Sequence, residues 1–155
     1  MPKRSQPPEP PALALKEPHD SAGAKLTARI EKALEVGARQ VQNLEDAEAF
    51  NKDYIKWDEY NATLLQSLFT NDDPLTQYRW SVSATVVTHD ETAYDAYHRN
   101  LEFLRGKGDH LESLVERLQL IPLATGVAAA PPPVAAPLPT DRGCRRLQPD
   151  GQKLR

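Results

Sequence analysis

Histidine and cysteine are the residue types most often used for metal or nucleophilic chemistry, and here their spacing supports neither. The histidines are His19, His89, His98 and His110, and the one cysteine is Cys144. No two histidines form the close pair on one helix face that zinc sites use. The cysteine lies in a polar stretch without a partner for catalysis. We therefore expect surface histidines and no metal site.

Carboxylates are plentiful, but their positions are those of helix surfaces and helix caps. The residues concerned are Asp53, Asp58, Glu59, Asp72 and Asp73. No glycine-rich loop follows a strand, so none of the known phosphate-binding loops is indicated. No serine has the sequence context of a nucleophile elbow. The sequence thus predicts a chain that is not an enzyme and that uses no cofactor.

Aromatic side chains are the remaining candidates, and they suit protein contacts. Trp57, Tyr94 and Tyr97 lie on apolar helix faces and are predicted to be core residues. Tyr60 and Trp80 lie off those faces. They either mark a contact surface or belong to the packing of a segment over 74–88 on the helices, and we prefer the second interpretation.

Helices must position these residues, because apolar residues recur at spacings of three and four through most of the chain. The clearest run predicts a helix over 88–121, with Thr88 and Glu91 as a capping box and Pro122 at its end. Its apolar face consists of Tyr94, Tyr97, Leu101, Leu104, Gly108, Leu111, Val115 and Leu118. Gly106 and Gly108 either interrupt this helix or lie within it, and the unbroken phase favours one continuous helix.

Two amphipathic runs precede this helix. They predict helices over 24–42 and 47–69, with apolar faces formed by Leu26, Ile30, Leu34, Gly37, Val41 and Leu44 and by Phe50, Tyr54, Trp57, Asn61, Leu64 and Leu68. Gly37 either admits a close helix contact or weakens its helix. Asn61 either fixes the register from within the core or turns to water. Asp46 is the expected N-cap of the second helix.

A short helix over 74–79, with Asp73 as its N-cap, and an extended connection over 81–88 complete the pattern. The chain is predicted to be all-α, a three-helix antiparallel, coiled-coil-like bundle with a long third helix. At about 1.5 Å per residue the three helices span about 30, 35 and 50 Å, so the third should overhang the others. We expect another copy or a following domain to bind this end, and the predicted interaction surface consists of Leu111, Leu114, Val115, Leu118 and Ile121, with Tyr60 and Trp80.

Proline separates the helical region from its flanks. Of the 14 prolines, only Pro74 lies between residues 18 and 122, and proline is incompatible with helix interiors and sheet ladders. We therefore expect a disordered segment over 1–23 and a helical domain over 24–122. An Ala/Pro-rich linker and a disordered basic tail should follow over 123–155.

Charge and composition predict that the binding partners are proteins. Residues 24–122 carry 11 Lys plus Arg against 17 Asp plus Glu, and such an acidic domain is a poor match for nucleic acid. Residues 123–155 carry 5 Lys plus Arg against 2 Asp plus Glu. No signal-peptide pattern and no apolar stretch of membrane-spanning length is present, and a single cysteine fits a reducing compartment. A cytoplasmic protein without nucleic-acid or membrane partners is expected.

Three segments of the chain are distinctive. They are Lys56-Trp57-Asp58-Glu59-Tyr60-Asn61, Tyr78-Arg79-Trp80-Ser81 and the ending Leu111-Glu-Ser-Leu-Val-Glu-Arg-Leu-Gln-Leu-Ile-Pro122. Together they resemble the helical N-terminal region of bacterial proteins whose C-terminal half is a TIR-like, predicted nucleotide-binding domain associated with anti-phage defence. The resemblance covers about residues 25–122 and implies a role in assembly or sensing.

The TIR-like domain itself has no counterpart in the sequence, because residues 140–155 show no strand pattern. One hypothesis is a truncated or frame-shifted product, and no nucleotide-binding residue can be carried over. The predicted function is that of a non-catalytic helical module for oligomerisation or partner binding. A homo-oligomer is one form that this module is expected to take. The alternative is a free-standing small helical adaptor or regulator of an unrelated family, which binds a helix in its groove.

Overall fold

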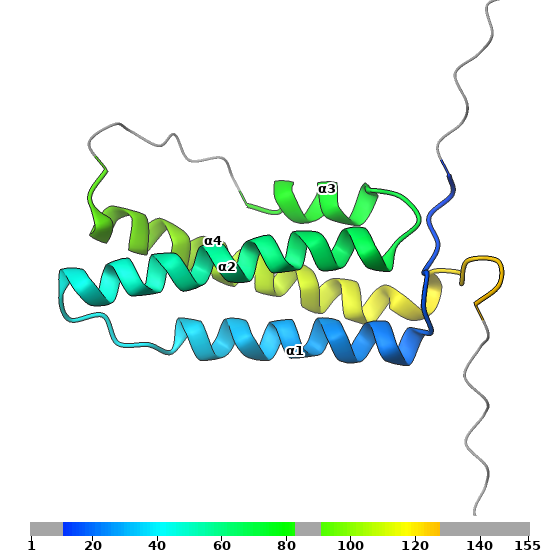
Figure 1. The fold of residues 1–155 in the computed structure, drawn as a ribbon, viewed down its shortest axis with the longest axis horizontal. Helices are drawn as coiled ribbons and strands as arrows, with labels where there is room; N and C mark the ends of the chain where they lie inside the picture. Colours follow the sequence, from blue (N-terminus) through cyan, green and yellow to red (C-terminus); the bar gives the residue numbers. More distant parts are fainter. Residues whose placement is uncertain (1–10, 83–90, 128–155) are drawn as a thin grey trace, which may run out of the picture.

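The computed structural model describes residues 11–82 and 91–127, and these residues form α-helices without a β-strand (Figure 1). The helices are α1 (His19–Gly37), α2 (Leu44–Leu68), α3 (Asp73–Trp80) and α4 (Ala93–Arg117), followed by the 3-10 turn η1 (Leu118–Leu120). The all-α class is therefore confirmed. Residues 83–88 of the expected extended connection, residues 1–10 of the expected disordered N-terminal segment and the basic tail lie outside the described residues.

Helix α1 begins five residues before the predicted start and ends five residues before the predicted end. Pro18 precedes it with a ψ of 145°, which is a non-helical conformation suited to a helix start. Its buried face combines two alanines, Ala22 and Ala33, with Leu26 and Val36. The predicted face is therefore wrong at Leu34, which is 70% exposed. Gly37 does allow close contact, because a Cβ there would lie 3.4 Å from Leu104 Cδ2.

Helix α2 follows the predicted pattern closely. Its six predicted face residues, Phe50, Tyr54, Trp57, Asn61, Leu64 and Leu68, are all buried. Asn61 is buried within the core, so the interpretation that it turns to water is wrong. The N-cap is Asn43, whose side chain accepts a hydrogen bond from Asp46 N at 2.9 Å. The predicted cap, Asp46, instead accepts a hydrogen bond from Gln42 N at 3.0 Å.

Helix α4 is continuous through Gly106 and Gly108, as predicted, but it starts later than expected. Thr92 and Asp95 form its capping box, and Glu91 precedes the helix, so the predicted helix start at residue 88 is wrong. Thr88 itself lies outside the described residues. The helix has 25 residues, the same number as α2, and the expected long third helix is therefore not longer than its neighbour. Helix α3 starts at Asp73, with Pro74 in the first turn, where proline is tolerated. Its N-cap is Asp72, so the predicted N-cap at Asp73 is wrong.

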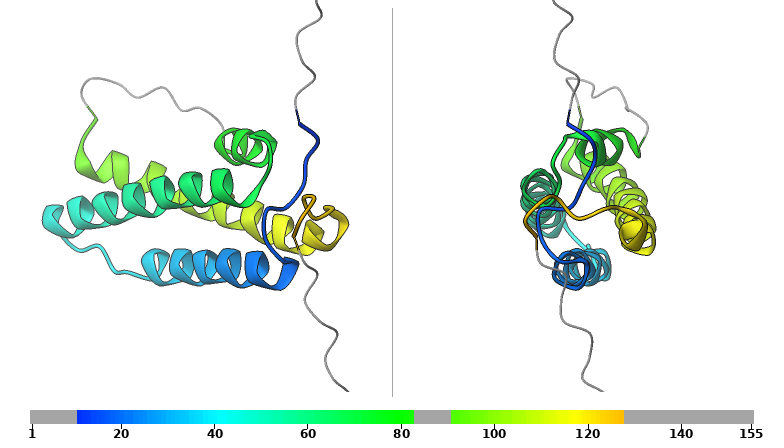
Figure 2. Two further views of the ribbon diagram at one scale, coloured as in Figure 1. Left: turned by 45° about the vertical axis from the view of Figure 1, so that its right-hand side comes forward. Right: turned by 90° about the vertical axis from the view of Figure 1, so that its right-hand side faces the viewer.

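The three long helices pack against one another, and their directions differ from a uniformly antiparallel arrangement (Figures 1 and 2). The start of α2 contacts the start of α4, where the Phe50 and Tyr97 rings meet edge to face at 4.9 Å. Toward α2, Arg29 O accepts from Trp57 Nε1 at 2.9 Å, and Arg39, just past the end of α1, pairs with the earlier Asp53. Toward α4, Gly23 lies beside Leu118 and Gly37 beside the earlier Leu104. Later residues of α1 thus meet earlier residues of both helices, so α1 runs antiparallel to both. Helices α2 and α4 are therefore parallel, and both begin at the same end of the bundle (Figure 1).

The segment before α1 belongs to the packed domain, so the expected disordered region over 1–23 extends too far. Leu15 is 0% exposed and lies between the ends of α2 and α4. Its amide donates to Pro122 O at 2.8 Å, and its carbonyl accepts from Ala124 N at 2.7 Å. Lys16 N donates to Leu68 O at 2.8 Å. These bonds satisfy backbone groups that a buried loop would otherwise leave unpaired, and they close one end of the helical domain (Figure 2).

Candidate functional site

The apolar end of α4, which we expected to lack partners, is covered within this chain. Leu111, Leu114 and Leu118 are buried, and Val115 and Ile121 are partly buried against the core. The cover comes from the N-terminal segment and the start of α1, which sequence reasoning had assigned to a disordered tail. The predicted overhang is therefore wrong, because α4 is shorter and its partners begin earlier than expected.

Tyr60 and Trp80 are exposed, at 57% and 75%. The preferred interpretation, that they serve the packing of the 74–88 segment, is wrong for both rings. They lie on different helices, α2 and α3, and Tyr60 has the guanidinium of Arg29 over its ring at 4.4 Å from the centroid. These two rings remain candidates for contact, whereas the five predicted residues of α4 and η1 do not form an open surface.

An open groove lies instead between α1 and α4, with a volume of about 430 Å³. Residues lining it are Ile30, Ala33, Leu34, Gly37, Ala38, Leu104, Arg105, Gly108, Asp109 and Glu112. None of the predicted interaction residues is among them. Small residues from both helices leave the groove open, and Leu34 stands exposed at its edge. We call this set of ten residues the α1/α4 groove.

The α4 side of this groove carries charges of both signs. Arg105, Asp109 and Glu112 are exposed and lie on one side of α4, since their spacings of four and three place them on one helix face. The sequence contains this pattern, but the exposure of Leu34 beside it is visible only in the structure. An apolar patch next to charged residues is typical of a protein-binding surface.

A second notable group is a largely buried polar network that joins α1, α2, α3 and α4. Asp58 Oδ1 accepts hydrogen bonds from Tyr78 Oη and from Lys107 Nζ, each at 2.7 Å. Asn61 Nδ2 donates to Tyr78 Oη at 3.1 Å, and Arg29 Nε donates to Asn61 Oδ1 at 2.8 Å. The expectation that Asp58 is a surface or capping carboxylate is therefore wrong, because it joins three helices.

This network is suited to holding helices in register rather than to catalysis. Burial, followed by the charge of Asp58, raises the pKa of Tyr78 far above its ordinary value, so its hydroxyl stays protonated and donates. Lys107 is only 7% exposed, and its Nζ also lies 5.1 Å from the Tyr78 ring centroid. Each member is bonded to another member of the network, which is the condition under which buried polar groups are tolerated.

Two histidines are not the plain surface residues that were expected. His19 Nε2 lies 2.8 Å from Ile121 O and joins the start of α1 to the end of η1. His110 packs its ring against Tyr78 at 6.3 Å between centroids, and its Nε2 is buried without a hydrogen-bond partner. Burial, and then the charge of Arg117, lowers the pKa of His110 below its ordinary value of 6.5.

Within the described ranges 11–82 and 91–127, no three His, Cys, Asp or Glu side chains are placed to hold a metal ion together. None of the helices in those ranges has the length and apolar character needed to cross a membrane. The structure thus offers a groove and a polar network as the features from which function can be argued.

Comparison of the chain with protein-family models, with curated proteins and with solved structures gives no match in any of the three. The resemblance to TIR-associated helical regions stays a prediction. Function has to be argued from the shape of the α1/α4 groove and from the charges beside it.

Proposed function

We propose that this chain is a non-catalytic helical interaction module that self-associates by placing the α1/α4 grooves of two copies face to face. The observation that supports this proposal is the exposed Leu34 at the edge of an open groove whose floor contains Ala33, Gly37 and Gly108. The bundle of α1, α2 and α4 serves as the scaffold that holds this surface.

The residues that line the groove suit close contact between helices of the two copies. Small residues let a second helix backbone approach closely, because there is little side chain between the two helices. Burial of one leucine side chain contributes about 1.5–3 kcal/mol. In a symmetric pair, Leu34 is buried twice, so this residue alone supplies about 3–6 kcal/mol toward association.

The charge pattern beside the groove favours a second copy of the chain as its partner. In a symmetric pair, the same patch meets itself in the opposite direction. A two-fold axis that passes between the two copies, perpendicular to α4 and level with the peptide between Gly108 and Asp109, places Arg105 of one copy opposite Glu112 of the other, since both lie three and a half residues from the axis. Two such ion pairs then form. The two Asp109 carboxylates lie next to each other beside the axis, and each is within one helical turn of Arg105 of the other copy.

Sedimentation of the wild-type chain and of Leu34→Asp at micromolar concentration tests this proposal. We expect a dimer for the wild type and a monomer for Leu34→Asp, because the variant buries a carboxylate in an apolar interface. Leu120→Asp is the matched control, since Leu120 is also exposed but lies outside the groove. A monomeric wild-type chain would overturn self-association and would favour the adaptor function, in which the groove accepts a helix of another protein.

A further inference from the structure

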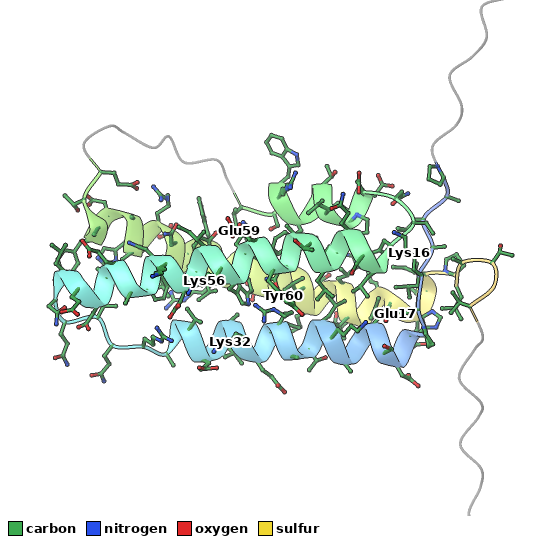
Figure 3. All side chains as sticks on the ribbon, viewed as in Figure 1. Lys16, Glu17, Lys32, Lys56, Glu59 and Tyr60 are labelled. Atoms are coloured by element: carbon green, nitrogen blue, oxygen red, sulfur yellow. The ribbon has the colours of Figure 1, made fainter. Side chains whose placement is uncertain are left out.

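The opposite side of α1 lines a second groove, shared with α2, with a volume of about 270 Å³. Its lining residues are Arg29, Lys32, Val36, Arg39, Asp53, Lys56, Trp57 and Tyr60. Four of these eight side chains are basic and one is acidic, although residues 24–122 as a whole are acidic. Figure 3 shows Lys32 on α1 and Lys56 and Tyr60 on α2, on the face where these helices lie side by side.

Two of the four basic residues pair with carboxylates, and the positive charges of the other two have no such partner among the described residues. Arg39 forms an ion pair with Asp53. Lys32 bonds both carboxylate oxygens of Glu35 at 2.8 Å, but this pair is exposed and such pairs contribute little. Among the described residues, no carboxylate lies within ion-pairing distance of Arg29 or Lys56.

Arg29 is the most informative of these residues, because it is held in place and partly buried without a counter-ion. Its Nε donates to Asn61 Oδ1, and its guanidinium lies over the Tyr60 ring. Burial lowers the pKa of Arg29 below its ordinary value. The guanidinium thus keeps its orientation, and no carboxylate in the ranges 11–82 and 91–127 pairs with it. An anion bound beside the guanidinium would stabilise its partly buried positive charge.

We propose that this groove binds a small, multiply charged oxyanion of the phosphate or pyrophosphate type. Arg29 and Lys32 contribute from α1 and Lys56 from α2, and the weak exposed bond between Lys32 and Glu35 can be given up. A ligand with a single carboxylate would need only the guanidinium of Arg29. Three cations therefore suit a ligand with several negative charges better. The groove's volume fits a small molecule, and the acidic surroundings disfavour a long polyanion such as nucleic acid.

The probe is inorganic pyrophosphate, added to the full chain at low salt and followed by titration calorimetry. We expect binding that weakens about tenfold in Lys56→Gln, the loss that corresponds to one charge-assisted contact. Lys52→Gln is the matched control, because Lys52 is exposed on the same helix but does not line the groove. Arg29→Lys keeps the charge and loses the planar fork, so we expect a loss of similar size.

Arg29→Lys also removes the hydrogen bond to Asn61. If the Arg29→Lys chain fails to fold, Lys56→Gln still tests the proposal. Parallel titrations with inorganic phosphate, glycerol phosphate and citrate identify the ligand chemistry. Stronger binding of glycerol phosphate than of inorganic phosphate would assign the site to phosphate esters, and the reverse to free phosphate. Absence of pyrophosphate binding, equal loss in Lys52→Gln, or tighter binding of citrate than of pyrophosphate would overturn the proposal.

Discussion

Replacement of Lys107 by methionine tests the buried network most sharply. Lys107 Nζ lies 2.7 Å from Asp58 Oδ1, and its side chain is almost fully buried, whereas that of Asp58 is 30% exposed. Methionine is similar in length and keeps the apolar contacts of the lysine stem. The substitution therefore removes the charge and leaves Asp58 with Tyr78 as its remaining donor in the network.

The expected loss follows from the unequal burial of the two partners. Removal of one partner from a fully buried ion pair costs about 3–5 kcal/mol. Water can reach the carboxylate of Asp58, so we expect a smaller loss of about 2 kcal/mol for Lys107→Met. Asp58→Asn leaves the more deeply buried cation unpaired, and we expect about 3 kcal/mol for that variant.

Urea unfolding, followed by the fluorescence of the buried Trp57, measures these losses. A loss of about 2 kcal/mol lowers the urea midpoint by roughly 1 M when the slope is about 2 kcal/mol/M. The double variant should lose less than the sum of the single losses, with a coupling energy of about 1–3 kcal/mol. Lys52→Met, at an exposed position on α2, is the control. Additive losses, or a Lys107→Met chain as stable as the wild type, would refute this account of the network.

Two further predictions concern pH and the N-terminal segment. Because the folded chain holds His110 with a lowered pKa, the unfolded chain takes up the proton first, so the free energy of unfolding should fall as pH drops below about 6.5. His110→Gln should flatten that part of the stability profile, measured by urea unfolding between pH 5 and 8, and an unchanged profile would argue against this role. Leu15→Ala should lose about 2–5 kcal/mol in the same assay, whereas Leu120→Ala should lose little, and equal losses would contradict a closing role for Leu15.

Helix α2 could be predicted from the sequence because its buried residues are large and regularly spaced. Phe50, Trp57 and Leu64 stand out in any count of apolar residues, and all are buried. Helix α1 was harder, because much of its buried face consists of alanine, which occurs equally on helix surfaces. A pattern based on large residues therefore placed Leu34 in the core, whereas the structure exposes it.

Contacts between segments far apart in the sequence could not be predicted from the sequence alone. Lys107 looked like a residue between two glycines, and its partner Asp58 lies 49 residues away. Leu15 ends a short apolar run, residues 12–15, between prolines, and only its contacts with the ends of α2 and α4 explain its burial. The candidate groove depends on the same kind of information, because the charges of Arg105 and Glu112 are visible in the sequence while the open space beside them is not.

The most direct test of the proposed self-association uses charge reversal at the α1/α4 groove. In Arg105→Glu, two glutamates face each other in a symmetric pair, and in Glu112→Arg two arginines do. Each reversal affects two ion pairs at about 1 kcal/mol each, which corresponds to roughly 30-fold weaker association. Arg79→Glu, at an exposed position of α3 away from the groove, controls for the change in net charge.

An equimolar mixture of the two variants restores both ion pairs, because each variant then faces the opposite charge. We predict by sedimentation that each variant alone is mainly monomeric at a concentration where the wild type and Arg79→Glu are dimeric, and that the mixture forms a heterodimer. Variants that dimerise alone as well as the wild type, or a mixture that stays monomeric, would contradict pairing through this groove.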